Sequence, residues 1–346
     1  MDSERRPRLT PAIADVRRAV REALPVVPAG ASPVEAPLVL VALSGGPDSL
    51  ALAAAVAFEA PRAGLRAGAV IVDHGLQPGS ADVATRAARQ AQELGLDPVI
   101  IRTVTVAAAG TPEGASGPEA SARTARYTAL AAVAAETGAA TVVLGHTLDD
   151  QAETVLLGLG RGSGAGSIRG MERVTGIYSR PLLGIRRSDT VQACADATLE
   201  PWNDPQNSDD AFTRVRVRNR VLPLLEAELG PGIAEALART AEQLREDDDA
   251  LDHFAEEIAE ELADIAEAGI SLPVRALASN PAALRQRLIR LAVQSEFHLS
   301  LSRAHTLEVA RLVTDWHGQG PLDLPGVRVE RQGGLIVFSA TQPASL

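Results

Sequence analysis

The sequence predicts an α/β fold in which a parallel sheet with helices on both faces is followed by a smaller, mainly helical C-terminal domain ending in a β-hairpin. Three observations support this prediction. Up to Pro223, short apolar runs of strand type alternate with longer helical stretches. Beyond Pro223 the apolar residues are spaced as in helices. Close to the C-terminus, a strand-like alternation resumes around a pair of glycines.

The first part of the chain, residues 1–36, is predicted to form a helix over 11–24 and then a linker, because PVVPAGASPVEAP is rich in proline and small residues. The next part, residues 37–223, alternates strands and helices. Its predicted strands are 38–43, 68–72, 99–106 and 141–144. Its predicted helices are 49–59, 80–94, 119–136 and 149–159. This order predicts a parallel sheet that is covered on both faces.

The last part, residues 224–346, is predicted to be mainly helical. Its apolar residues recur every seven positions, with two more widening the stripe: Leu237, Leu244, Leu251, Ile258 and Ile265, then Phe254 and Leu262. This spacing predicts one amphipathic helix with a buried apolar face. Residues 274–295 and 302–316 are also predicted to be helical. The segment PLDLPGVRVERQGGLIVFSA predicts a hairpin that turns at Gln332, Gly333 and Gly334.

The composition excludes several classes of protein. Cys194 is the single cysteine, which excludes a disulfide framework and a thiolate zinc site; we expect it to be buried in a helix. All 33 residues counted as Lys or Arg are arginine, so neither a Walker A loop nor a Schiff-base lysine can exist. We find no signal peptide and no apolar run near the motifs long enough to span a bilayer. We therefore expect a cytoplasmic protein without a membrane partner.

The charge is uneven along the chain. A net charge of −11 argues against a protein that binds nucleic acid over its whole surface. Residues 161–187 nevertheless contain six arginines and a single acid, Glu172. Such a strip can bind a polyanion, or it can be an ordinary solvated surface.

Polar clusters follow three of the predicted strands. SGGPDS, residues 44–49, follows the first strand, Asp73-His74-Gly75 the second, and Gly145-His146 the fourth. Ligands of parallel sheets bind at the carboxyl ends of the strands. Because glycines leave backbone N–H groups accessible at the start of a helix, SGGPDS predicts an anion site.

The stretch LGHTLDDQAET places a histidine and three acids at the start of one predicted helix: His146, Asp149, Asp150 and Glu153. Acids at a helix N-terminus are favourable by about 0.3–1 kcal/mol each, which alone explains Asp149 or Asp150. Three acids beside a histidine, close to the predicted anion site at SGGPDS, also suit Mg²⁺. The spacing leaves both interpretations open.

Taken together, SGGxDS, DHGL, ARxxRY and GHxxDDQxET resemble the PP-loop ATP pyrophosphatases. Further segments are similar to the tRNA(Ile)-lysidine synthetases within that group: RGSGAGSIRGM, RPLL and WNDPQNSDDAFTRVRVRNRVLP. The resemblance extends from Val39 to Pro223 and implies a Rossmann-like PP-loop sheet. It also implies the family reaction, in which ATP adenylates the wobble cytidine of the isoleucine tRNA with a CAU anticodon. Free L-lysine then displaces AMP, and codon reading switches from AUG to AUA.

The resemblance also implies roles for individual residues, with ATP and Mg²⁺ as cofactors. The nucleotide would be bound by Ser44, Gly45, Gly46, Pro47, Asp48, Ser49, Asp73 and His74. The catalytic residues would be Asp48, His146, Asp149, Asp150 and Glu153, and of these Asp48, Asp149 and Asp150 would bind the metal. The tRNA or the activated substrate would be bound by Arg123, Arg126, Arg161, Arg169, Arg214 and Arg218. A homodimer is one possible assembly.

Two departures from the family pattern limit what the resemblance implies. Thr147 stands where many members have a second histidine, and the chain ends where longer relatives carry a further tRNA-binding module. Two alternatives remain open. One is another PP-loop enzyme, such as a tRNA thiolase, although thiolation commonly uses paired cysteines. The other is a non-catalytic ATP sensor, which would not need the acids of LGHTLDDQAET or the distal arginines.

Overall fold

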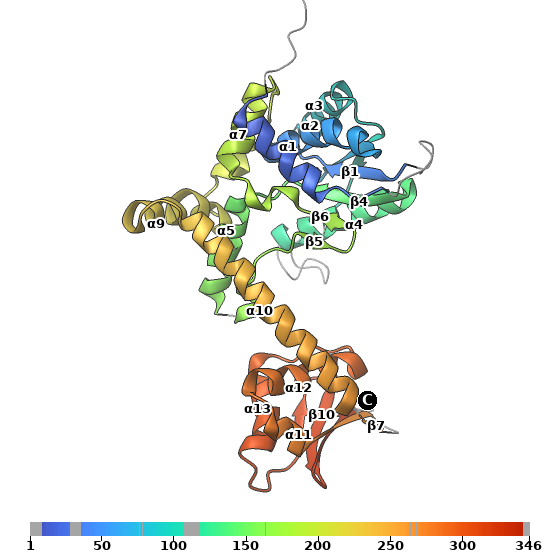
Figure 1. Ribbon diagram of the computed structural model, residues 1–346, viewed down its shortest axis with the longest axis vertical. Coiled ribbons are helices and arrows are strands. Elements are labelled where there is room, and N and C mark those ends of the chain that lie inside the picture. The colour runs from blue at the N-terminus through green and yellow to red at the C-terminus, as the bar shows by residue number, and fades with distance from the viewer. Residues whose placement is uncertain are drawn as a thin grey trace, which may run out of the picture. The chain divides into compact units, whose positions relative to one another are not determined.

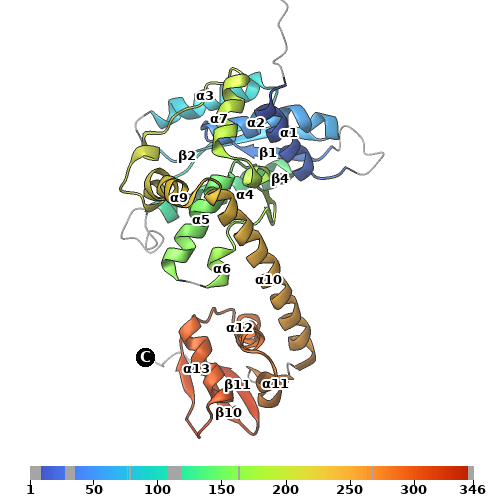
Figure 2. The same cartoon turned by 60° about the vertical axis from the view of Figure 1, so that its left-hand side comes forward.

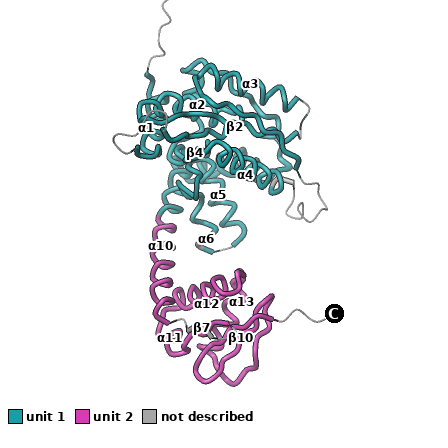
Figure 3. Tube along the Cα trace, turned by 90° about the vertical axis from the view of Figure 1, so that its right-hand side faces the viewer, with its two compact units in different colours: residues 1–242 teal, residues 243–346 magenta. Residues whose placement is uncertain are grey.

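The computed structural model describes residues 9–27, 36–75, 77, 79–106, 118–162, 164–262, 264–266 and 269–341 (Figure 1). Contacts divide the chain into two compact units, residues 1–242 and 243–346 (Figure 3). The division falls within helix α10 (Ile233–Leu262). The functional domains 1–36, 37–223 and 224–346 therefore stay a prediction.

The sheet of the first unit has six strands in its described part, in the order β3-β2-β1-β4-β6-β5. The strands are β1 (Leu38–Ala42), β2 (Arg66–Asp73), β3 (Val99–Thr103), β4 (Ala139–Leu144), β5 (Val174–Thr175) and β6 (Tyr178–Ser179). All neighbours pair in parallel except β5 and β6. The predicted parallel sheet is thus confirmed. The two short strands were not predicted, because two residues carry no recognisable alternation.

The helices of this unit connect the strands and cover both faces of the sheet (Figures 1 and 2). They are α1 (Pro11–Ala23), α2 (Pro47–Glu59), α3 (Ser80–Glu93), α4 (Pro118–Thr137), α5 (Leu148–Arg161), α6 (Ala165–Ile168), α7 (Arg187–Asp196), α8 (Thr213–Arg216) and α9 (Leu222–Leu229), with a π-helical turn over 217–221 and short 3₁₀ turns at Pro61–Ala63, Pro181–Gly184 and Pro205–Ser208. The order of the predicted strands and helices is confirmed.

The alternation of β1 explains the two layers of helices. Val39 and Val41 point to a core that includes residues of α1, α2, α3 and α7. Leu38 and Leu40 point to the opposite face and pack with Leu130 and other residues of α4. Since successive side chains of a strand alternate between faces, a strand that is apolar throughout needs a cover on each side.

Cys194 lies buried in α7, as predicted. Its thiol donates to the carbonyl of Pro47 at 3.3 Å, and burial raises its pKa to about 12. This thiol is therefore a packing group that connects α7 to the first turn of α2.

The second unit contains an antiparallel sheet in the order β7-β8-β11-β10-β9. Its elements are β7 (Asp264–Ala266), β8 (Gly269–Pro273), β9 (Leu322–Leu324), β10 (Val327–Gln332), β11 (Leu335–Ala340), α11 (Val274–Ser279), α12 (Ala282–Phe297) and α13 (Arg303–Thr314). Ile289 and Phe338 are fully buried in its core. The predicted hairpin is confirmed as β10 and β11, within a larger sheet than expected.

The predicted seven-residue stripe is only partly realised. Helix α10 ends at Leu262, so Ile265 belongs to β7 instead. Phe254 is 51% exposed, and the apolar residues of this helix that are buried are Ala234, Ala241 and Ala255. The prediction of one buried face along the whole stripe is therefore wrong. In the described part of the chain, no helix has the length and apolar character needed to cross a membrane.

Candidate active site

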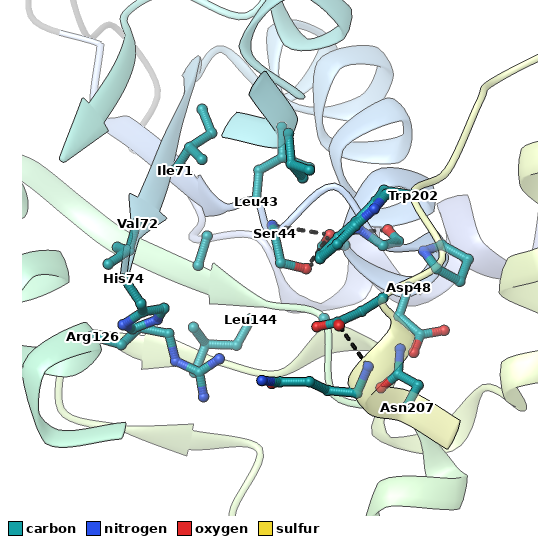
Figure 4. A pocket seen from close by; sticks show the side chains of 18 of the residues that line it. Leu43, Ser44, Asp48, Ile71, Val72, His74, Arg126, Leu144, Trp202 and Asn207 are labelled. Atoms are coloured by element: carbon teal, nitrogen blue, oxygen red, sulfur yellow. Dashed lines mark hydrogen bonds between the residues drawn. The ribbon is translucent and has the colours of Figure 1, made fainter. Parts of the chain in front are cut away.

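A pocket of about 720 Å³ opens at the carboxyl ends of β1, β2 and β4 (Figure 4). It is lined by all three polar clusters expected at these strand ends: Ser44 to Ser49 except Gly45, Asp73 to Gly75, and Gly145 with His146. Because these strands are neighbours and parallel, their ends lie at one edge of the sheet. The pocket is therefore our candidate active site.

The segment SGGPDS, residues 44–49, which we call the phosphate loop, forms a tight turn into α2. Gly45 has a φ of 84°, a left-handed conformation that favours glycine, and Gly46 is the N-cap residue of α2. The hydroxyls of Ser44 and Ser49 are 3.0 Å apart, and Ser49 Oγ accepts from the Ser44 amide. The loop thus presents a helix N-terminus and two hydroxyls, a combination suited to an anion.

Gly145 lets β4 approach this loop. A Cβ atom built on Gly145 would lie 3.0 Å from the amide nitrogen of Ser49 and 3.1 Å from the Ser49 Cα. A side chain at position 145 would therefore push the end of β4 away from the first turn of α2. Sequence reasoning did not identify this requirement, because a lone glycine at a strand end carries no such signal.

Asp48 lines the pocket and accepts hydrogen bonds from two side chains of α7. Its carboxylate accepts from Arg187 Nε at 3.2 Å and from the hydroxyl of Thr190. Burial raises the pKa of Asp48, since the favourable effects of Arg187 and Thr190 only partly offset the loss of solvation. The charge of Asp48 is thus held in a poorly solvated position.

Asp150 also lines the pocket, from the first turn of α5. Thr147 donates to it through its amide at 2.8 Å and its hydroxyl at 2.9 Å, and Arg187 Nη2 donates at 2.7 Å. Burial opposes ionisation, but Arg187, Thr147 and other neighbours outweigh burial and hold the pKa of Asp150 below its ordinary value. Thr147, the departure from the family pattern, thus serves in a capping box.

Glu153 lies behind the pocket rather than on its surface. Its side chain is 0% exposed and accepts from Arg218 at 2.7 and 3.1 Å and from Arg187 at 3.3 Å. Arg214 Nε is 3.6 Å away. Arg214 and Arg218 do line the pocket, but their charges are shared with this buried acid.

Asp149 is not among the described residues that line the pocket. Its carboxylate accepts from the Arg187 amide at 2.7 Å, at the first residue of α7, and lies 3.3 Å from Arg186. Asp149 therefore stabilises the start of α7.

Arg123 and Arg126 line the side of the pocket formed by α4, with Arg126 beside His74 (Figure 4). Within the described residues, neither guanidinium forms an ion pair with a carboxylate; Arg123 donates to the Tyr127 hydroxyl at 3.3 Å. Burial and the nearby Arg123 lower the pKa of Arg126. These two arginines are the pocket cations best placed to receive an anionic ligand.

Arg161 and Arg169 are not among the described residues that line the pocket. Arg161 is exposed at the end of α5, and Arg169 is 3.6 Å from Glu172. Any contact of theirs with a substrate would therefore be made outside this pocket.

Two pocket histidines have a ring nitrogen without a partner. The Nδ1 atoms of His74 and His146 are buried and have no hydrogen-bond partner among the described residues. Burial lowers the pKa of both, and that of His146 falls to about 4, with Arg126 contributing to the decrease. His146 is therefore a neutral ring at physiological pH.

This environment predicts how stability depends on pH. An unfolded chain protonates histidine near pH ~6.5, whereas folded His146 does so only near pH 4. The unfolded state thus binds the proton first, and stability should fall as the pH is lowered from ~6.5 towards 4. In denaturant titrations across this range, His146→Asn should lose less stability than the wild type. An equal loss of stability in both proteins would show that protonation of His146 does not cause the pH dependence.

Sequence reasoning missed several residues of the site. Arg187 lines the pocket from α7, and Asn203, Asp204, Gln206 and Asn207 line it from the segment that follows α7. Thr190 of α7 is not among the described lining residues but bonds to Asp48. Trp202 also lines the pocket and donates its amide to the Gly45 carbonyl at 2.9 Å. Arg187 lay within the recognised arginine-rich strip, but nothing local distinguished it from its neighbours.

A magnesium site can be tested against these contacts. In the described residues, no three Asp, Glu, His or Cys side chains gather as metal ligands. Mg²⁺ in nucleotide sites is usually bound by one or two carboxylates together with phosphate oxygens and water. Of the three predicted metal ligands, Asp48 and Asp150 suit that donor set because both line the pocket, whereas Asp149 is not among the described lining residues and bonds to the Arg187 amide.

Comparison with known proteins agrees with this geometry. The family model described as PP-loop domain matches residues 19–225, and the one described as TilS substrate binding domain matches residues 272–334. A relative from Leifsonia xyli, named tRNA(Ile)-lysidine synthase, is 65% identical, covering 87% of this chain and 89% of its own. One of the same name from Thermobifida fusca is 51% identical, covering 95% and 98%.

A solved structure is similar in fold. The U34-tRNA thiolase NcsA from Methanococcus maripaludis aligns with a TM-score of 0.55 and 20% identity, covering 68% of this chain and 80% of that one. At this identity the likeness shows the fold alone.

Proposed function

Because the chain belongs to the tRNA(Ile)-lysidine synthase family of PP-loop enzymes, we propose that it joins free L-lysine to C2 of the wobble cytidine of the isoleucine tRNA with a CAU anticodon. As a member it is an ATP-dependent ligase that acts on tRNA(Ile). The proposal further includes an adenylated tRNA intermediate, a switch of codon reading from AUG to AUA, a cytoplasmic location and a possible homodimer. The observation that carries it is the pocket, where the phosphate loop and Asp48 meet Arg123 and Arg126, which form no ion pair with a described carboxylate.

In the first step, the C2 oxygen of the cytidine attacks the α-phosphorus of ATP, the α–β bond breaks and pyrophosphate leaves. The amides at the start of α2, with Ser44 and Ser49, would bind the leaving pyrophosphate. Arg126 would balance charge on the opposite side, since it lines the pocket and pairs with no carboxylate in the described part of the chain. Asp48 and Asp150 would hold Mg²⁺, which when bound neutralises phosphate charge.

In the second step, the ε-amine of lysine attacks C2, the C2–oxygen bond breaks and AMP leaves with that oxygen. The attacking nitrogen must be neutral, and it loses a proton as the new bond forms. Asp150 and Glu153 already accept hydrogen bonds from arginines, whereas His146 has a free ring nitrogen beside Asp150. We propose that a pocket carboxylate binds the lysine and that His146 or solvent receives the proton.

The second step should depend on pH. The ε-amine has a pKa near ~10.4, so only about one molecule in a few thousand is neutral at pH 7. At subsaturating lysine, the rate of transfer should therefore rise between pH ~7 and ~9. Rapid-quench measurement starting from adenylated tRNA isolates this step. A transfer rate that stays constant over this range would show that lysine deprotonation does not limit it.

The proposed function is tested by product release. With ATP, lysine and the CAU-anticodon transcript, the protein should release AMP and pyrophosphate in equal amounts, and omission of the transcript should abolish turnover. A non-catalytic ATP sensor would release neither. An enzyme for another RNA would respond to a different transcript, and a thiolase would require a sulfur donor.

A further inference from the structure

Arg187 is the residue of the pocket with the most carboxylate partners. Its three guanidinium nitrogens are divided among three acids: Nε lies 3.2 Å from Asp48, Nη2 2.7 Å from Asp150 and Nη1 3.3 Å from Glu153. These partners come from the first turn of α2 and from α5. The contacts hold the pKa of Arg187 above its ordinary value despite burial. One planar group thus joins the phosphate loop to the acids of α5.

The position of Arg187 is itself held by the fold. It is the first residue of α7, and its amide donates to Asp149 at 2.7 Å. Thr190, one turn later, has its hydroxyl within hydrogen-bonding distance of both Asp48 and the Arg187 carbonyl. The side chain of Arg187 is 22% exposed, so it is sheltered yet reaches the pocket. A side chain anchored in this way loses little entropy when it binds its partners.

The acids around Arg187 are balanced within the protein. Asp48, Asp150 and Glu153 carry three negative charges, and Arg187, Arg214 and Arg218 carry three positive ones. Asp48 and Asp150 are the two predicted metal-binding acids that line the pocket, and Arg187 contacts both. A cation already bridges these carboxylates before any nucleotide arrives.

We propose that Arg187 is a positioning residue that serves as a built-in counter-cation between Asp48 and Asp150, so that a divalent ion enters the pocket only together with nucleotide phosphates. The inference rests on the proposed function for the identity of the nucleotide. Its physical basis is independent of that: a divalent ion near Arg187 is repelled by the guanidinium and finds both carboxylates engaged. The phosphates of ATP would supply the negative charge that the two acids then lack.

The test is the binding of Mn²⁺, a spectroscopic substitute for Mg²⁺, followed by electron paramagnetic resonance. The nucleotide-free wild type should bind Mn²⁺ weakly, and an ATP analogue with an uncleavable α–β bond should strengthen binding by about tenfold or more. Without nucleotide, Arg187→Met should also bind Mn²⁺ about tenfold or more tightly than the wild type, because the cation shared by Asp48 and Asp150 is gone and Asp150 keeps its weaker pair with Arg218 at 3.3 Å. Arg187→Lys, which keeps the charge, should bind weakly like the wild type.

Arg186→Met is the matched control. Arg186 is the adjacent arginine, but it pairs with Asp149, Glu226 and Glu235 and is not among the described lining residues. Its replacement should leave Mn²⁺ binding unchanged. Equal Mn²⁺ affinity in the wild type with and without the analogue would overturn the proposal, and this measurement needs no folded variant. So would an Arg187→Met protein that is folded but binds like the wild type.

The outcome is separable from that for lysidine formation. If Mn²⁺ binding follows the expected pattern and no lysidine forms, the role of Arg187 stands and the proposed function fails. If lysidine forms while Mn²⁺ binds tightly without nucleotide, the proposed function stands and the role of Arg187 fails.

Discussion

Asp48→Asn should lower the rate of adenylation by about 10²-fold or more, while the protein remains folded. Asn keeps the shape of the side chain and can still accept from Thr190, but it removes the charge that faces Arg187 and the phosphate loop. The lost charge is needed where pyrophosphate charge develops and where Mg²⁺ would bind. Single-turnover AMP formation with saturating ATP and tRNA measures the effect on this step alone.

Asp149→Asn is the matched comparison, because the sequence assigns Asp48 and Asp149 the same metal-binding role. The structure places Asp149 at the start of α7, bonded to the Arg187 amide, outside the described pocket lining. We therefore expect a loss of less than about tenfold for Asp149→Asn, the scale of a weakened helix cap. Equal losses in the two variants would show that the geometry of the pocket does not separate their roles.

Glu153→Gln should destabilise the protein by about 3–5 kcal/mol. The carboxylate is 0% exposed and has Arg187, Arg214 and Arg218 around it. Its neutralisation leaves three guanidinium groups close together with less compensating charge in a poorly solvated region. Equilibrium unfolding in urea gives the free energy of unfolding directly.

Glu136→Gln is the control for this prediction. Glu136 also pairs with an arginine, Arg102, but its side chain is 54% exposed. An exposed ion pair contributes about 0–1 kcal/mol, so this variant should unfold close to the wild type. If both variants lose the same small amount, the cluster around Glu153 is not a stabilising element of the fold.

Much of the fold could be predicted because its signals are local. Val39 to Leu43 reads as a strand and SGGPDS as a turn into a helix without knowledge of any other segment. The meeting of Ser44, Asp73 and His146 then follows from the geometry of parallel sheets. Ile265 was assigned wrongly for the same reason: a seven-residue spacing can continue by coincidence past the end of a helix.

The pairing of charges could not be predicted, because it depends on contacts between distant segments. Arg218 and Glu153 are 65 positions apart, and the resemblance implied that the arginine binds the tRNA or activated substrate and that the acid is catalytic. In the fold they bind each other. Arg187 meets Asp48 across 139 positions, and no local pattern selects it from the arginines around it. The tRNA-binding roles of Arg214 and Arg218 stay predictions.

The most direct test of the central claim is the fate of labelled lysine. The protein is incubated with ATP, Mg²⁺, labelled L-lysine and the isoleucine tRNA transcript with a CAU anticodon, and the RNA is digested to nucleosides for mass spectrometry. We expect one lysine per tRNA, attached to the cytidine at the wobble position, with one AMP released for each. AMP release without label in the RNA, or label on another nucleotide, would contradict it.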